Sequence, residues 1–283
     1  MTGGAASGSA RRILLLTGGH RVDFDALFEM MESVCALRGW LWAHAHQPSA
    51  QRWLDPSSAG EWDAVLCHDL PGVRLKRGEA PAAVGPDDAV RADLVELLRR
   101  GQGLVFMHHA LAGWPAWDGW ARALGGRFLY APGSLRGTRW PSSGTRITRY
   151  TARIVGSGHP VCEGVDDFEL TDELYCCPVF ADEVVPLLRT DADLDRRLFV
   201  STYEHVLHGA DGAPDCSAHP PASDLIGWAT VAERSPVVYL QPGDSGATFG
   251  LVPYRRLVAN ALEWVASPPA HEWAGGRPVP LEN

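Results

Sequence analysis

Two adjacent histidines, His108 and His109, are the side chains of this chain best placed to do chemistry. They end a short apolar run, Leu104 to Met107, that has the composition of a buried parallel strand, and a helical pattern from Pro115 to Leu124 follows. Ligands of open α/β sheets bind where strands end, so at least one of the two imidazoles is expected in a site. Neighbouring side chains of a strand point to opposite faces, so both can face one pocket only if a turn intervenes.

Polar side chains also follow other predicted strands. Because the carboxyl ends of parallel strands meet at one edge of a sheet, these turns are expected to converge with the histidine pair on one pocket. A strand-rich middle segment can bring Glu173 and Tyr175 to the same edge. The residues that follow the first, third and last strands are His20, His68, Asp69, Gln241 and Asp244.

A histidine beside a carboxylate is suited to general acid–base catalysis, since the pKa of either group can be tuned toward neutral pH. We therefore predict catalytic roles for His108, His109 and Glu173. The same donor types can bind a divalent metal ion such as zinc, with His20, His108 and Glu173 as ligands, and chemistry without a metal stays open. The residues predicted to contact substrate are His20, Asp69, Trp114, Tyr175, His219, Gln241 and Asp244.

Some of these residues also have simpler interpretations. His68 can cap the Asp-Leu-Pro-Gly turn that begins at Asp69. Trp114, Trp117 and Trp120 can form a wall on which a sugar stacks, but the last two have the spacing of helix core residues. The sequence leaves both interpretations open.

A long aperiodic segment, residues 202–224, precedes a predicted core strand and is interpreted as a loop. His205 and His208 would share one face of a helix, but they match no strong zinc motif and are interpreted as incidental loop residues. His219 differs because two prolines follow it and fix the backbone. We therefore predict that His219 belongs to a lid over the pocket.

The elements that position these residues alternate between strands and helices. Predicted helices begin after Asp23, after Asp87 or Asp88, and near Pro253, and apolar residues recur in them at helical spacing. Predicted strands lie between them, and this order implies a doubly wound, mostly parallel α/β sheet. The segment from Gly125 to about Asp191 is predicted to be a strand-rich insertion.

Length, charge and composition limit the classes of function. The 283 residues, 46% of them hydrophobic, suffice for a single α/β domain at residues 11–267, with a disordered leader at 1–10 and a Pro-rich C-terminal arm at 268–283. The net charge of −9 without a basic block argues against a nucleic-acid partner, and no apolar run is long enough to span a membrane. Six cysteines without a C-x-x-C pair are typical of reduced thiols, so a cytoplasmic location is expected.

Several familiar motifs do not occur in the sequence. A G-x-S-x-G elbow, a G-x-G-x-x-G turn after the first strand and a Walker sequence are all missing. An ordinary α/β-hydrolase, a dinucleotide site and a P-loop nucleotide site are therefore not supported.

Four segments resemble the trehalose-utilisation (ThuA-like) family. They are Leu14–His20, Gly103–Trp114 with Leu124–Phe128, His159–Tyr175, and Val238–Asp244 with the closing helix Tyr254–Val265. The resemblance implies a class I glutamine amidotransferase-like, flavodoxin-like fold. In amidotransferases the central elbow carries a nucleophilic Cys, whereas His108 and His109 occupy that place here, so glutaminase activity is not expected. Many members have Gly-His after the last strand, and Gly243-Asp244 departs from that pattern.

The resemblance also implies a role in the processing of sugars, including keto-sugar derivatives formed by a partner sugar dehydrogenase. We therefore expect a carbohydrate-active hydrolase or lyase with a small-molecule sugar substrate and a His/carboxylate pocket, with or without a divalent metal. The alternatives are a non-catalytic sugar- or protein-binding module on an amidotransferase-like scaffold and a structural partner that forms a homo-oligomer. A pocket without convergent histidines and carboxylates would favour the binding module.

Overall fold

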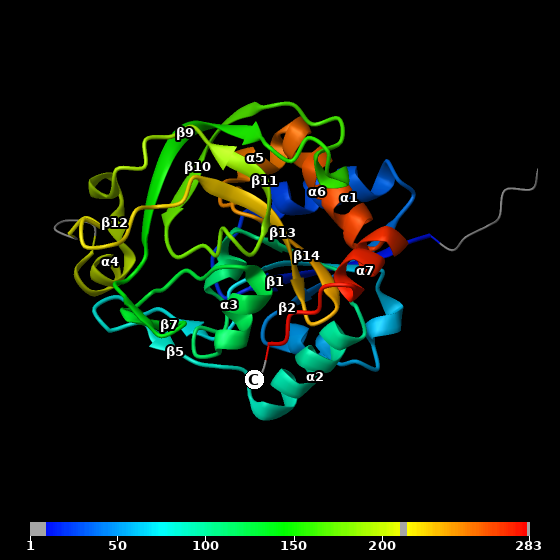
Figure 1. Ribbon diagram of the computed structural model, residues 1–283, viewed down its shortest axis with the longest axis horizontal. Coiled ribbons are helices and arrows are strands. Elements are labelled where there is room, and N and C mark those ends of the chain that lie inside the picture. Colours follow the sequence, from blue (N-terminus) through cyan, green and yellow to red (C-terminus); the bar gives the residue numbers. More distant parts are fainter. Residues whose placement is uncertain (1–9, 210–213, 282–283) are drawn as a thin grey trace, which may run out of the picture.

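A ten-stranded sheet forms the centre of the protein (Figure 1). Its strands are β1 (Arg12–Gly18), β2 (Leu41–His46), β3 (Ala64–Asp69), β6 (Leu104–Met107), β9 (Gly144–Ile154), β10 (Phe168–Cys176), β11 (Val185–Thr190), β12 (Val200–Ser201), β13 (Leu225–Ala232) and β14 (Ser235–Leu240). The computed structural model describes residues 10–209 and 214–281. Residues 1–9 of the expected leader lie outside the described residues.

The strands lie side by side in the order β10-β9-β11-β13-β14-β6-β3-β1-β2, and β12 pairs with β9. The half from β2 to β14 is parallel. Numbered along the chain, its five strands have the order 2-1-3-4-5, which is the flavodoxin-like order. The predicted α/β fold class is confirmed, and the carboxyl ends of these strands share one edge, as the site prediction requires.

Helices pack on both faces of the sheet (Figure 1). Alternate residues of β1 point to the two faces, so Ile13 joins the core beneath α1 and α6, while Leu14 joins the core beneath α2 and α3. The molecule therefore has three layers. The helices are α1 (Phe24–Ala36), α2 (Asp88–Arg99), α3 (Asp118–Leu124), α4 (Thr202–His208), α5 (Gly246–Gly250), α6 (Val252–Val265) and α7 (Pro268–Gly275).

The predicted helix starts are present in the structure. The side chain of Asp23 accepts a hydrogen bond from the Ala26 amide at the start of α1, and Asp87 does the same for Val90 in α2. Pro253 lies in the first turn of α6, where its missing N–H costs nothing.

The strand-rich insertion extends the same sheet. β9 pairs antiparallel with both β10 and β11, and β11 joins them to β13. In this register Glu173 on β10 lies opposite Ile147 on β9. The insertion thus carries Glu173 to the edge where the parallel strands end.

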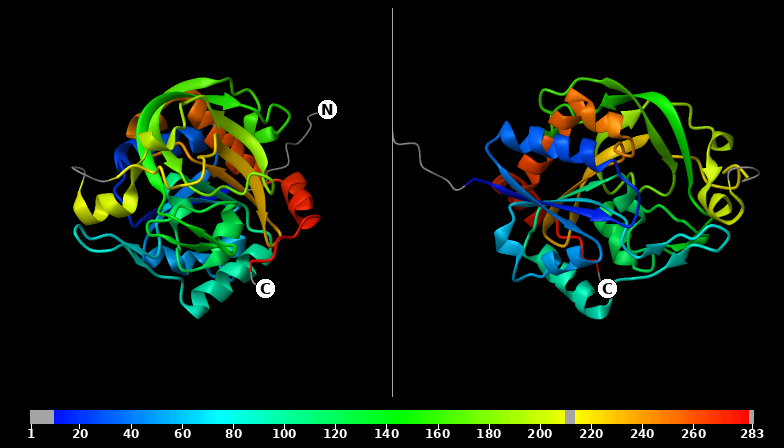
Figure 2. Two further views of the ribbon diagram at one scale, coloured as in Figure 1. Left: turned by 60° about the vertical axis from the view of Figure 1, so that its left-hand side comes forward. Right: turned by 180° about the vertical axis from the view of Figure 1, so that it is seen from behind.

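Two short hairpins complete the fold. They are β4 (Val73–Arg74) with β5 (Ala82–Ala83), and β7 (Gly133–Leu135) with β8 (Thr138–Trp140). The loop between β4 and β5 lies beside α4, because the Gly78 amide donates to the Val206 carbonyl oxygen at 2.9 Å. Figure 2 shows this pair of segments projecting together on one side of the molecule.

Two segments differ from the expectations. The start of the predicted 202–224 loop is helix α4, which Ser201 caps through its side chain. The C-terminal segment, expected as an arm, begins with helix α7, and its Ala270, Ala274 and Leu281 are buried. Both helices are too short for their periodicity to stand out in the sequence. The Ser201 cap stabilises α4, none of whose described residues is buried, and the burial of Ala270 and Ala274 stabilises α7.

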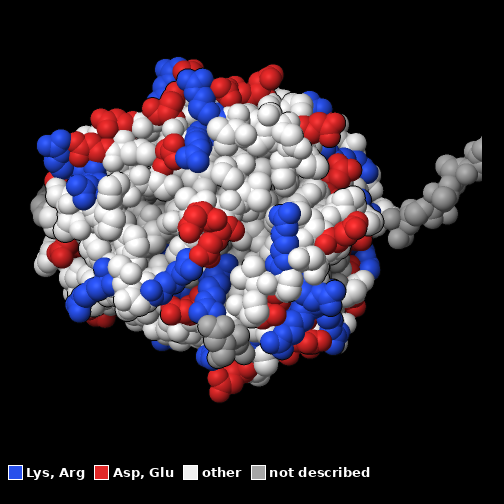
Figure 3. Space-filling view, viewed as in Figure 1, with Lys and Arg blue, Asp and Glu red and all other residues white. Residues whose placement is uncertain are grey.

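Acidic and basic side chains are interspersed over the face shown in Figure 3, and the basic ones do not form one continuous area there. Within residues 10–209 and 214–281, every helix is too short or too polar to cross a bilayer.

Candidate active site

His108 occupies a strained position at the end of β6. Its φ of 44° is unusual for a residue with a side chain, and the chain turns there into a short 3-10 helix, His108–Ala112. The turn that the sequence analysis required therefore occurs at His108 itself. As a result, both imidazoles face the same side.

The His108 ring is fixed at both nitrogens. Nδ1 donates to the Gln241 carbonyl oxygen at 2.6 Å, and Nε2 lies 3.2 Å from Glu173 Oε2 and 3.7 Å from Asp244 Oδ1. The Tyr175 ring packs against the imidazole, with ring centres 4.7 Å apart. The bond to Gln241 leaves Nε2 as the nitrogen that faces the carboxylates.

Asp172 holds the turn that carries Asp244. Its buried carboxylate accepts hydrogen bonds from the backbone amides of Gly243, Asp244 and Ser245 and from the Thr248 hydroxyl. Neighbouring residues of a strand point to opposite sides, so β10 sends Asp172 under this turn and Glu173 toward His108. Asp172 is therefore a positioning residue.

Four side chains converge at this point: His108, His109, Glu173 and Asp244. One potential ligand atom from each lies within 4.8 Å of all the others. We call these four residues the His/carboxylate cluster. The predicted ligand set differs, since His20 is not part of this group and His109 and Asp244 are.

His20 lies beside the cluster and supports it. Its ring stacks on His109 at a centroid distance of 4.1 Å, and its Nε2 lies 3.0 Å from the His68 carbonyl oxygen. Gly19 makes this approach feasible, because at its φ of 84° an added Cβ would lie 2.2 Å from the Leu70 carbonyl oxygen. His20 therefore orients His109 and does not reach the carboxylates.

Opposing effects set the charge of His108. Burial alone would lower the pKa of its imidazole, but the hydrogen bond with Glu173 and the negative charges of Glu173, Asp172 and Asp244 raise the pKa to about 9. Without a metal ion His108 is therefore protonated at neutral pH and balances the carboxylates.

The pKa values of the neighbouring His109 and Asp244 are shifted as well. Burial, together with the positive charge of His108, holds the pKa of His109 well below its ordinary value. Burial also raises the pKa of Asp244. A neutral imidazole, a protonated imidazole and carboxylates thus lie within a few ångströms of one another, which is the set of groups that proton transfer needs.

The cluster opens into a cavity of about 590 Å³. His109 and Glu173 lie among its lining residues, and Tyr130, Thr145 and His205 contribute further polar groups. The volume is in the range of small-molecule sites. His109 and Glu173 are therefore accessible to a ligand of sugar size.

Other predicted substrate contacts lie outside this cavity. Asp69 is buried and accepts from Gln47 Nε2 at 2.8 Å, and burial raises its pKa to about 6. Trp114 is buried over Gly72, and Gln241 contributes its backbone oxygen to His108. Trp117 and Trp120 are buried in the core, so the sugar-stacking interpretation is wrong for these two residues.

His219 does not reach the cavity. Its ring is buried, with Nδ1 3.3 Å from Cys176 Sγ and 2.8 Å from the Pro220 carbonyl oxygen, and it packs on Trp140. The ring therefore lies against Cys176, the last residue of β10. This placement contradicts the geometry of the predicted lid.

Three residues of the site were not recognised from the sequence as functional candidates. Tyr130 gave no signal, and Asp172 was not distinguished from Glu173. His205, interpreted as an incidental loop residue, lies on α4 and lines the cavity. The signal for α4 was the S-x-x-E pattern from Ser201 to Glu204, which is typical of a helix N-terminus.

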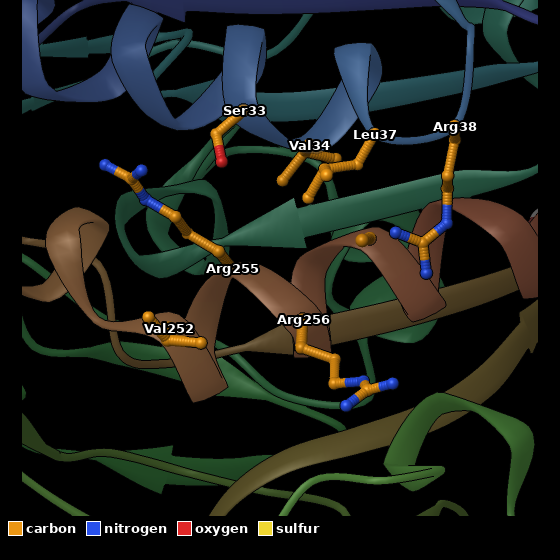
Figure 4. Close-up of a pocket in the computed structure, with 8 residues that line it drawn as sticks. Ser33, Val34, Leu37, Arg38, Val252, Arg255 and Arg256 are labelled. Carbon is orange, nitrogen blue, oxygen red and sulfur yellow. The ribbon is translucent and has the colours of Figure 1, made fainter.

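A second hollow, of about 350 Å³, lies between α1 and α6. Figure 4 shows Arg38, Arg255 and Arg256 around it, with Val34 and Leu37 on the α1 side. Two of the arginines are paired, Arg38 with Glu263 and Arg255 with Glu29. Its described lining residues include no histidine or carboxylate, so it is less suited to acid–base chemistry than the cavity at the cluster.

The sequence also matches a known protein family. The sequence profile named ThuA, described as trehalose utilisation, matches residues 81–265. This chain belongs to the ThuA family. The matched range includes His108, His109, Glu173 and Asp244, so the whole His/carboxylate cluster lies in the ThuA region.

Solved structures show that the ThuA fold extends beyond the matched range. A protein described as ThuA-like from Parabacteroides merdae ATCC 43184 superposes with a TM-score of 0.63 at 15% identity, covering 92% of this chain and 91% of that one. A ThuA-like protein from Bacteroides uniformis ATCC 8492 gives 0.61 at 15% identity, with 94% and 95% covered. Comparison with the curated proteins finds no match.

Proposed function

We propose that this protein is a carbohydrate-processing enzyme, a hydrolase or lyase that acts on a sugar or keto-sugar derivative at the His/carboxylate cluster. The observation that carries the proposal is the convergence of His108, His109, Glu173 and Asp244 at the end of one cavity. The family is described by trehalose utilisation, which supports a sugar as the substrate. A non-catalytic binding module has no need for such a set of proton-transfer groups.

The cluster suggests how the protons move. Glu173 and the neutral His109 are the groups able to take a proton from water or from a carbon next to a sugar carbonyl. Protonated His108 is fully buried, so its proton would reach a departing oxygen through Glu173, the partner of its Nε2, which completes the transfer. Gln241 keeps the His108 ring in this orientation through its carbonyl oxygen, and Asp172 keeps Asp244 beside it.

The same cluster fits a divalent metal ion. Its donors are two imidazole nitrogens and two carboxylates, a set that suits zinc or a similar first-row ion, and the buried Nδ1 of His109 has no hydrogen-bond partner among the described residues. The Gln241 carbonyl oxygen would hold His108 as metal-bound histidines are commonly held. A bound ion would polarise a sugar oxygen and take over the charge balance that the His108 proton provides.

A keto-sugar substrate implies a preceding reaction. A sugar dehydrogenase would have to oxidise a hydroxyl group of the glycoside to a ketone before this enzyme acts. We propose such a dehydrogenase as the functional partner, working in sequence with this protein.

Turnover of glycosides by a matched pair of variants tests the function. Tag-free protein is incubated with glycosides and with their keto derivatives, and release of the leaving group is followed by chromatography. Glu173→Gln should lower turnover at least about 100-fold, the usual contribution of an acid–base group. Glu169→Gln, on the exposed part of the same strand, should leave it unchanged.

The same assay separates the two chemistries. If a metal ion takes part, a chelator abolishes turnover and zinc restores it. If turnover is insensitive to the chelator, proton transfer alone carries the reaction. Equal turnover in Glu173→Gln and Glu169→Gln would contradict the proposal.

A further inference from the structure

The cavity beside the His/carboxylate cluster has an unusual wall. Among the described residues eleven large apolar side chains are exposed, and four of them line this one cavity. Their exposed fractions lie between 40 and 68%. These four residues, which we call the aliphatic strip, are Leu75, Ile147, Leu198 and Val200.

The strip begins directly beside the cluster. Ile147 lies opposite Glu173 in the β9–β10 pair, and opposite residues of an antiparallel pair point to the same face at a Cβ separation of about 5 Å. Thr145, two residues before Ile147, shares that face and lies opposite Val200 on β12. One face of the sheet therefore runs from the carboxylate of Glu173 to Ile147 and on to Val200.

Two segments outside β9 and β12 also contribute apolar side chains to the cavity lining. Leu75 comes from the β4–β5 hairpin and Val206 from α4, and the hydrogen bond from the Gly78 amide to the Val206 carbonyl oxygen joins these two segments. Figure 2 shows both segments on the same side of the molecule. A group that leaves the cluster along the cavity thus meets these apolar side chains, with the polar groups of Tyr130, Thr145, Arg146, Thr202 and His205 between them.

Such a wall distinguishes between possible substrates. The hydroxyl groups of a second sugar unit would lose water there without gaining hydrogen bonds from aliphatic side chains, which is unfavourable. An apolar group would instead bury surface and bring the exposed strip out of water. Exposed apolar surface of this extent inside a cavity is typical of a binding site.

We propose that the aliphatic strip is a subsite for an apolar substituent of the substrate, so that the preferred substrates are glycosides or keto-glycosides with an alkyl or similar apolar leaving group. This proposal rests on the proposed function, because the cluster defines where the sugar ring lies. The strip then fixes the direction of the bond to the leaving group.

Binding of two glucosides tests the subsite without requiring turnover. Tag-free protein is titrated calorimetrically with methyl and with hexyl glucoside, in both anomeric forms. Full burial of one methylene gives about fourfold in affinity, and the partly open strip should give about twofold. Hexyl glucoside should therefore bind about 30-fold more tightly than methyl glucoside.

Two variants assign that preference to the strip. Ile147→Thr keeps a β-branched residue in β9, so the strand is retained, and it should lower the affinity for hexyl glucoside at least about fivefold without changing that for methyl glucoside. Leu41→Thr, at a comparably exposed leucine on β2, should change neither affinity.

The outcomes are distinguishable from those of the turnover assay. Equal affinities for the two glucosides, or failure of hexyl glucoside to bind, would overturn the subsite. An Ile147-dependent preference measured in a protein without turnover would support the subsite while the catalytic proposal fails. If sedimentation shows that Ile147→Thr dissociates an oligomer and glucoside affinity is unchanged, the strip is a subunit interface and the proposal is wrong.

Discussion

His108 is fully buried and lies between two partly exposed carboxylates, Glu173 and Asp244. Two negative groups at this separation need a positive charge near them, and either a proton on Nε2 of His108 or a metal ion in the cluster supplies it. The proposed chemistry depends on this positive charge, whether a proton or a metal ion supplies it.

The protonation of His108 gives a first prediction. In chelator-treated protein, NMR titration should give His108 a pKa of about 9. Its pKa is raised on folding, so its contribution to stability, about 3 kcal/mol, is complete below pH 6.5 and disappears as the pH rises through 9. Glu173→Gln should lower the His108 pKa, because it removes the negative charge of Glu173 that counteracts the effect of burial.

Urea unfolding at several pH values checks the same coupling. Between pH 6.5 and 9.5 the wild-type protein should lose more stability than Glu173→Gln does. Parallel stability profiles for the two proteins would show that His108 and Glu173 are not coupled.

At the scale of elements, one buried carboxylate holds the last turn of the parallel half. Asp172 on β10 accepts from the amides of Gly243, Asp244 and Ser245, and the His68 Nε2 lies 2.8 Å from the Gly243 carbonyl oxygen. The turn after β14 is thus attached to β10 on one side and β3 on the other. The position of Asp244 depends on both attachments.

Asp172→Asn should weaken this turn. The Asn side chain has one acceptor oxygen and no negative charge, and its NH2 group would face the backbone N–H donors of the turn. The free energy of unfolding should therefore fall by about 2–4 kcal/mol. Asp166→Asn, at an exposed aspartate, is the matched control. Equal urea midpoints for the two variants would refute a structural role for Asp172.

His219 gives a prediction opposite to that of a lid. Because its imidazole is buried between Cys176 and Trp140, His219→Ala should leave a cavity and lower stability by about 1–3 kcal/mol. His208→Ala, at an exposed histidine of α4, should have little effect. A normal melting temperature together with lost sugar binding would restore the lid interpretation.

The sequence predicted the elements whose signals are local. Caps and helical spacing identified α1, α2 and α6, and the rule for parallel strands indicated the edge at which His108 lies. Glu173 lies on antiparallel β10, to which that rule does not apply. The placement of His109 depends on the φ of 44° at His108, a strained turn with no sequence signal. His219 was misplaced because its burial depends on packing between distant segments, which periodicity does not encode.

At the scale of the whole molecule, the site lies where two kinds of sheet meet. The parallel half supplies His108, His109 and Asp244, the antiparallel extension supplies Glu173 with Ile147 and Val200, and Leu75 of the strip comes from the β4–β5 hairpin. The family profile covers both halves of this junction. The central claim is therefore that a sugar binds at the junction, against the His/carboxylate cluster.

A crystal structure of tag-free Glu173→Gln protein with a bound glycoside or keto-glycoside tests this claim most directly. The variant slows turnover and keeps the substrate intact. We predict a sugar oxygen within hydrogen-bond distance, about 2.6–3.2 Å, of the His109 imidazole, with the leaving group along Ile147 and Val200. A sugar bound elsewhere, such as in the arginine-lined hollow between α1 and α6, would contradict the account.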